Sequence, residues 1–171
     1  MKNLHCPSCG TPYVRLTHAE GKIGRVLNQC KIFPFRCQLC TNRFRTFWAG
    51  SPNGGATHAD RRQYKRLPAS FHADFVKDKA LQAHNRVTDI SMGGCTVETA
   101  SILPQGTFLE LKIRPVSDQP MITVETARVC SMRPEGMGIQ FLEFQPEDKR
   151  RLGRVVLSLL VGQGVQPNPY S

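Results

Sequence analysis

The chain has 171 residues, of which 40% are hydrophobic and 21% charged, and it carries a formal net charge of +10. This is the composition of a soluble globular protein, and no apolar run approaches the ~20 residues that are needed to cross a bilayer. The seven cysteines, an odd number, argue against a complete disulfide framework.

The first residues lack the apolar core of a signal peptide. We therefore expect a cytoplasmic protein, whose cysteines stay reduced unless a metal holds them. The positive charge is uneven, because residues 1–60 hold eight Lys and Arg against two acids, whereas residues 61–171 hold 15 against 11. A basic N-terminal third suits an anionic partner such as nucleic acid, a nucleotide or an acidic protein face.

Two Cys-x-x-Cys pairs, Cys6 with Cys9 and Cys37 with Cys40, flank the N-terminal piece. This spacing lets both sulfurs of a tight turn point at one ion, while backbone amides of the turn donate to the sulfurs. The pattern predicts a four-thiolate site, for which Zn²⁺ is the best fit and iron the alternative. Four thiolates close the coordination shell, so we expect a structural ion, without which a piece of this size has too little core to fold.

Strand-like pieces lie at residues 12–16, 26–36 and 43–48, which indicates a zinc ribbon over residues 1–48. In the last piece Arg43 and Arg45 alternate with apolar residues. This basic face is as consistent with contact to nucleic acid as with a solvated strand face. Residues 49–60 contain Gly, Pro and Ser but no large apolar side chain, and we interpret them as a flexible linker that lets the ribbon reorient.

The linker ends in a basic run that contains Arg61, Arg62 and Arg66. Each guanidinium is a planar fork that can hold a phosphate or the edge of a guanine through two hydrogen bonds. Taken alone, however, such a run is more often a solvated basic linker or a nonspecific polyanion patch.

The remainder of the chain alternates between strands and short turns. Six strand-like segments without an intervening helix predict an antiparallel barrel or sandwich.

Pro146 and the acids after it indicate the start of a helix. Its apolar stripe is most simply a lid over one end of the barrel, with a dimer or partner face as the alternative. We read residues 163–171 as a frayed tail. The expected strands start near residues 69, 81, 94, 107, 121 and 137, and the stripe consists of Leu152, Val155, Val156, Leu159 and Leu160.

Two motifs in this order resemble those of the PilZ domain family, bacterial receptors for cyclic di-GMP. The family's Arg-x-x-x-Arg motif is matched by Arg62 to Arg66, with Arg61 in front, and its Asp/Asn-x-Ser-x-x-Gly motif by Asp89 to Gly94. A late Gly-x-x-Phe strand is matched by Gly138 to Phe141. The resemblance covers about residues 60–162 and implies a mainly β fold, in which a six-stranded antiparallel PilZ-type barrel at 61–162, with a C-terminal helix, follows the ribbon.

The resemblance also implies a ligand, and its chemistry suits these residues. The arginines Arg61, Arg62 and Arg66 would hold one guanine and the phosphates. Asp89 would accept from the N1–H and N2–H₂ edge of the other guanine. Ser91 would supply a hydroxyl, and Gly93 and Gly94 a backbone that the ligand can approach closely. A turn-capping role for Asp89 and a β-bulge at Gly94 are the structural alternatives.

We therefore predict a cyclic di-GMP receptor that couples nucleotide binding to reorientation of the zinc ribbon. The alternative is a zinc-ribbon regulator that binds nucleic acid, with the barrel as a scaffold or dimerisation unit. A protein partner of the ribbon, as the family suggests, and an oligomer are both compatible with the sequence. An enzyme is not expected, since no nucleophile, base and acid occur with usable spacing, and Cys95 and Cys130 read as small apolar strand residues.

Overall fold

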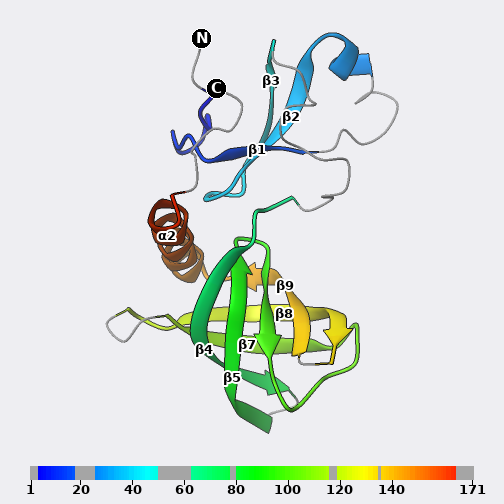
Figure 1. Ribbon diagram of the computed structural model, residues 1–171, viewed down its shortest axis with the longest axis vertical. Coiled ribbons are helices and arrows are strands. Elements are labelled where there is room, and N and C mark those ends of the chain that lie inside the picture. The colour runs from blue at the N-terminus through cyan, green and yellow to red at the C-terminus, as the bar shows by residue number, and fades with distance from the viewer. Residues whose placement is uncertain are drawn as a thin grey trace. The chain divides into compact units, whose positions relative to one another are not determined.

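The computed structural model describes residues 4–17, 26–49, 63–77, 80–115, 119–134 and 136–164. Most of the expected linker, 50–60, and of the expected tail, 165–171, lies outside these ranges. The chain divides into two compact units (Figure 1). One comprises Met1–Lys65 with Gly164–Ser171, and the other comprises Arg66–Gln163.

The first unit contains a three-stranded antiparallel sheet in the order β1-β2-β3 (Figure 1). Its strands are Val14–Leu16, Ile32–Cys37 and Arg43–Phe47. Together with the cysteine cluster this arrangement fits a zinc ribbon, as predicted. The stretch 26–36 is not strand throughout, because residues 26–29 form a helical turn before β2 begins.

The ribbon has a small aromatic core on one face of its sheet. Phe35 is fully buried and its ring stacks on Phe44, with 6.0 Å between ring centres. Trp48 meets Phe33 and Phe35 edge to face, at 5.6 and 6.1 Å. Besides these rings the core contains Val14 and two cysteines of the Cys-x-x-Cys pairs, Cys6 and Cys37. The cysteine cluster is therefore continuous with the apolar core of the ribbon.

The second unit is a closed six-stranded antiparallel barrel in the order β4-β5-β6-β9-β8-β7, with β7 returning to pair with β4. This confirms the predicted barrel. In β4 the predicted alternation holds, since Phe71, Ala73 and Phe75 are buried in the interior while His72 is exposed. The strands are β4 Leu67–Lys77, β5 Ala80–Ser91, β6 Gly94–Glu98, β7 Phe108–Arg114, β8 Ile122–Arg133 and β9 Gly136–Phe144.

Helix α2, Pro146–Gly162, follows β9 directly (Figure 1). Proline begins it, and Glu147 and Asp148 lie in its first turn, where carboxylates interact favourably with the helix dipole. Its apolar stripe packs against β4, β8 and β9. The buried members of the stripe are Leu152, Val155, Val156 and Leu160. Within the described ranges, no helix has the length and apolar content to span a bilayer.

Candidate functional site

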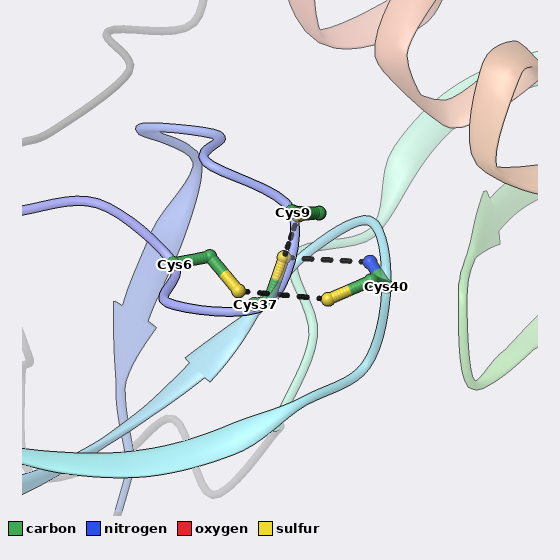
Figure 2. Close-up of side chains that lie close together, drawn as sticks. All are labelled: Cys6, Cys9, Cys37 and Cys40. Atoms are coloured by element: carbon green, nitrogen blue, oxygen red, sulfur yellow. Dashed lines mark hydrogen bonds between the residues drawn. The ribbon is translucent and has the colours of Figure 1, made fainter.

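The two Cys-x-x-Cys turns, here called knuckles, are Cys6 to Cys9 and Cys37 to Cys40. Their four cysteines converge on one point in the first unit (Figure 2). All four sulfurs lie within 4.8 Å of one another. The Sγ atoms of Cys6 and Cys40 are 3.5 Å apart, and those of Cys9 and Cys37 are 3.6 Å apart. Zinc–sulfur bonds of about 2.3 Å in a tetrahedron require sulfur separations of roughly 3.8 Å, so the sulfurs are spaced closely enough to share one ion.

Backbone amides prepare the sulfurs for a cation. The N–H groups of Leu39 and Cys40 donate to Cys37 Sγ at 3.4 and 3.3 Å. Burial opposes the charged form and raises the pKa of the Cys37 thiol. At Cys6 burial acts in the same direction, but hydrogen bonds from the Cys9 and Ser8 backbone outweigh it and lower the pKa to about 7. Bound metal would supply the positive charge that keeps all four thiolates deprotonated.

The two knuckles end alike. Gly10, after Cys9, has φ of +72°, the left-handed conformation that glycine adopts without steric strain. Thr41, after Cys40, adopts φ of +66°, which is uncommon for a β-branched residue. The second knuckle therefore forms the same turn as the first, although nothing in the residue type at position 41 indicates it.

In the second unit, Arg66 and Asp89 meet where β4 begins and β5 ends. Arg66 Nη1 donates to Asp89 Oδ1 at 2.9 Å and to Thr96 Oγ1 at 2.7 Å. Both members of the ion pair remain about a quarter exposed, with side-chain exposures of 28% and 27%. One residue from each sequence motif is thus present at one solvent-accessible place, whereas Arg61 and Arg62 lie outside the described residues.

A register shift explains why Asp89 points outward. Val87 and Ile90 are both fully buried although they are three residues apart, which strict alternation would not allow. The β5–β6 pairing shifts between Val87 and Asp89, and the extra residue reverses the side on which the following side chains lie. Without this irregularity Asp89 would face the apolar interior.

Thr96 is a site residue that sequence reasoning missed. It lies directly opposite Asp89, because a two-residue turn pairs Ser91 with Gly94 and Asp89 with Thr96. The signal was present in the sequence as the Met92-Gly93 turn, from which this register follows.

Ser91 and Gly93 have structural roles in that turn. Ser91 is 5% exposed, and its hydroxyl donates to the Gly94 carbonyl at 3.1 Å and accepts from the Gly93 N–H at 3.3 Å. The Gly93 carbonyl accepts from the N–H of Phe141 on β9. The hydroxyl is thus used to hold the shape of the hairpin that presents Asp89.

Gly94 is required by the barrel itself. A Cβ built there would lie 2.2 Å from the carbonyl oxygen of Ile139, a backbone atom of the neighbouring strand β9. The missing side chain at Gly94 therefore allows the backbone of β9 to approach β6 closely. This geometry concerns the fold, and a contact between ligand and Gly94 stays a prediction.

We expect Gly94→Ala to lower the free energy of unfolding of the barrel by about 3 kcal/mol, because the added methyl group must push two hydrogen-bonded strands apart. Denaturant unfolding followed by circular dichroism measures it. Gly162→Ala is the control, since nothing lies within 4 Å of its Cβ position at the end of α2. It should leave stability unchanged or raise it slightly. Equal stabilities for the two variants would contradict the steric argument.

The two barrel cysteines differ, since Cys95 is the buried strand residue that was predicted and Cys130 is not. Cys95 is fully buried on β6, and burial, followed by the negative charge of Asp89, raises the pKa of its thiol. Cys130 on β8 is partly exposed and donates weakly to Gln140 Oε1 at 3.4 Å. Neither belongs to a group of potential metal ligands among the described residues.

Comparison with known proteins points to one family. The family model described as "PilZ domain" matches residues 60–158. No curated protein matches the chain.

Three solved structures illustrate the similarity of fold. The PilZ domain with c-di-GMP of YcgR from Escherichia coli is 19% identical, with 61% of this chain and 95% of that one covered and a TM-score of 0.50. The inhibitor of motility MotI/DgrA of Bacillus subtilis is 19% identical, with 77% and 66% covered and a TM-score of 0.51. The K. pneumonia MrkH–c-di-GMP complex is 15% identical, with 78% and 73% covered and a TM-score of 0.53.

Proposed function

Because the chain belongs to the PilZ domain family, we propose that it is a receptor for cyclic di-GMP. The observation that carries the proposal is the meeting of Arg66 with Asp89, since these residues belong to two separate motifs and lie 23 positions apart. The domain of YcgR and the MrkH protein, both of similar fold, are described with this nucleotide bound.

The chemistry of the pair suits the two halves of the ligand. A guanidinium fork matches the O6 and N7 acceptors of guanine and also binds phosphate oxygens. A carboxylate accepts from the N–H donors on the opposite guanine edge. We propose that Arg66, with Arg61 and Arg62, holds one guanine and the phosphates, while Asp89 holds the other guanine. In the free protein the Arg66–Asp89 ion pair neutralises both charges until the ligand replaces part of it.

Nucleotide binding would then act on the ribbon. The two units meet along the chain between Lys65 and Arg66, so a ligand that binds Arg66 together with Arg61 and Arg62 would restrict how the ribbon can be oriented. We propose that the ribbon is the interaction module and that its orientation carries the signal to a protein partner. The four cysteines would hold a structural Zn²⁺ ion, which contributes folding energy and no chemical step.

A second candidate function rests on the face of the ribbon sheet that is opposite its core. The register pairs Arg15 with Arg36 and Arg36 with Arg43, so three guanidinium-bearing residues lie in one row across the strands. Arg45, two residues after Arg43, shares this face. Such a row suits a phosphate backbone and supports a regulator that binds nucleic acid.

A calorimetric titration of the zinc-loaded full chain with cyclic di-GMP tests the receptor function. We expect saturable binding with a dissociation constant of about 1 µM or below, and its stoichiometry will distinguish one nucleotide from a stacked pair. GMP is the control, since it has the base and a phosphate but not the cyclic dinucleotide arrangement. Absence of binding at about 100 µM would refute the proposal.

A salt-titrated gel shift with DNA and RNA, with and without the nucleotide, addresses the second candidate. Binding that is independent of cyclic di-GMP, in a chain that does not bind the nucleotide, would favour the nucleic-acid regulator. Binding that depends on the nucleotide would show that both functions operate in one protein.

A further inference from the structure

The side chain of Gln38 connects the metal knuckle to the arginine motif. Gln38 lies between the ligand candidates Cys37 and Cys40 and is only 7% exposed. Its Oε1 accepts from the backbone N–H of Lys65 at 2.7 Å, and its Nε2 donates to the carbonyl of Gln63 at 3.2 Å. The amide thus pairs with the backbone of residues 63 and 65 as a neighbouring β-strand would.

Both N–H donors of this buried amide and its oxygen have hydrogen-bond partners. The second hydrogen of Nε2 goes to the carbonyl of Arg36 at 3.3 Å. The opposite orientation of the amide would place an N–H against the Lys65 N–H and an oxygen against two carbonyls. The network therefore determines which atom of the amide is the oxygen and which is the nitrogen. A buried polar group that is satisfied in this way specifies one arrangement of its partners.

Tyr64, between the two residues that Gln38 holds, is tied to β2. Arg36 Nη1 donates to the Tyr64 hydroxyl at 2.7 Å, and the guanidinium carbon lies 5.3 Å from the centre of the tyrosine ring. Three consecutive residues, 63–65, are therefore held within the first unit. They are the three residues between Arg62 and Arg66 in the Arg-x-x-x-Arg motif.

We propose that this contact, the Gln38 clamp, positions the arginine motif for the nucleotide and thereby links nucleotide affinity to metal occupancy of the ribbon. This proposal rests on the proposed receptor function. Gln38 is placed by the two cysteines beside it, so loss of the ion releases the amide and frees residues 63–65. Every residue that is ordered before the ligand arrives reduces the entropic cost of binding.

The clamp favours binding rather than blocking it. Lys65 is the last residue that Gln38 holds, and the next residue, Arg66, already contacts Asp89 and Thr96. Holding residues 63–65 therefore does not require Arg66 to give up its contacts with Asp89 and Thr96, where the nucleotide is expected. By thermodynamic linkage, a metal that strengthens nucleotide binding is itself bound more tightly when the nucleotide is present.

Three variants separate the clamp from general effects on the ribbon. Gln38→Ala removes the amide. Tyr64→Phe removes only the hydroxyl that accepts from Arg36, and it lies outside the metal knuckle. Gln29→Ala makes the same truncation as the first variant at an exposed position of the ribbon. Zinc content of each protein is measured first, so that loss of metal is not mistaken for loss of the clamp.

The experiment measures amide hydrogen exchange at Lys65, the dissociation constant of cyclic di-GMP, and the dissociation constant of zinc, by competition with a chelator, with and without the nucleotide. We expect Gln38→Ala, or removal of zinc, to speed exchange at Lys65 and to weaken nucleotide binding about tenfold. Combining the two should add little, and Tyr64→Phe should give a smaller loss in the same direction. The dissociation constant of zinc should fall about tenfold when the nucleotide is bound, whereas Gln29→Ala should behave as the wild type.

Two results would overturn the linkage while leaving the receptor function intact. One is a nucleotide affinity that neither Gln38→Ala nor zinc removal changes. The other is an affinity that either of them raises, which would make the contact inhibitory. Failure of the zinc-loaded wild-type chain to bind cyclic di-GMP overturns both proposals, and it is recognised by the wild-type titration alone.

Discussion

Replacing Arg66 by alanine is expected to weaken the binding of cyclic di-GMP about 100-fold while the barrel stays folded. Truncating a charged residue that makes paired hydrogen bonds to a ligand makes the free energy of binding less favourable by about 3 kcal/mol, which corresponds to about 100-fold in affinity. Stability should change little, because the Arg66–Asp89 pair is partly exposed and such pairs contribute about 0–1 kcal/mol. Calorimetry measures the affinity, and denaturant unfolding measures the stability.

Arg114→Ala is the matched control for this substitution. Arg114 forms an ion pair of the same kind, with Asp74 at 2.6 Å, on strands β7 and β4 of the same barrel. We expect its loss to leave nucleotide affinity unchanged. Asp89→Asn should weaken binding as Arg66→Ala does, since the neutral amide keeps the shape but not the charge and the paired acceptors. Unchanged affinity in both Arg66→Ala and Asp89→Asn would remove the site assignment.

Removing the metal is expected to unfold the ribbon without unfolding the barrel. A structural zinc site contributes about 10–16 kcal/mol to folding, which is as large as the whole stability of a typical small domain. The apolar core of the ribbon is a few rings and aliphatic side chains and cannot replace this. Cys37→Ser, or a chelator, should therefore leave the second unit as the only cooperatively folded part.

The single tryptophan of the chain makes this measurement simple. Trp48 packs against Phe33 and Phe35 in the ribbon, so its fluorescence reports on the first unit alone. We expect its emission to shift to longer wavelength on metal removal, while the β-sheet circular dichroism of the barrel keeps its thermal transition. Cys30→Ser is the control, because Cys30 is an exposed ribbon cysteine outside the cluster. An unshifted emission in metal-free protein would show that the aromatic core keeps the ribbon folded without the metal.

Much of the barrel was predictable because its strands are amphipathic and its turns are short. The alternation of Phe71, Ala73 and Phe75 with polar residues identifies β4, and glycine turns separate the later strands. The convergence of the four cysteines was also predictable, since two Cys-x-x-Cys pairs are the usual ligand pattern of a four-thiolate metal site.

The details of the proposed nucleotide site could not be predicted by pattern alone. Strict alternation from Val87 would have placed Asp89 inside the barrel, and only the irregular pairing of β5 with β6 turns it outward. The Gln38 contact joins residues that are 25 and 27 positions apart and has no periodic signature. The helical turn at 26–29 interrupts a stretch whose β-branched and aromatic residues favoured a strand.

Closure of the barrel limits how another protein could bind to the second unit. Each of the six strands pairs with two neighbours, so among the described residues unpaired main chain is confined to the ends of strands, such as the part of β5 before Arg86, which pairs with β4 alone. A partner would therefore recognise mainly the outward side chains of the barrel and α2. Point substitutions on that surface, more than changes of strand length, would then alter the choice of effector.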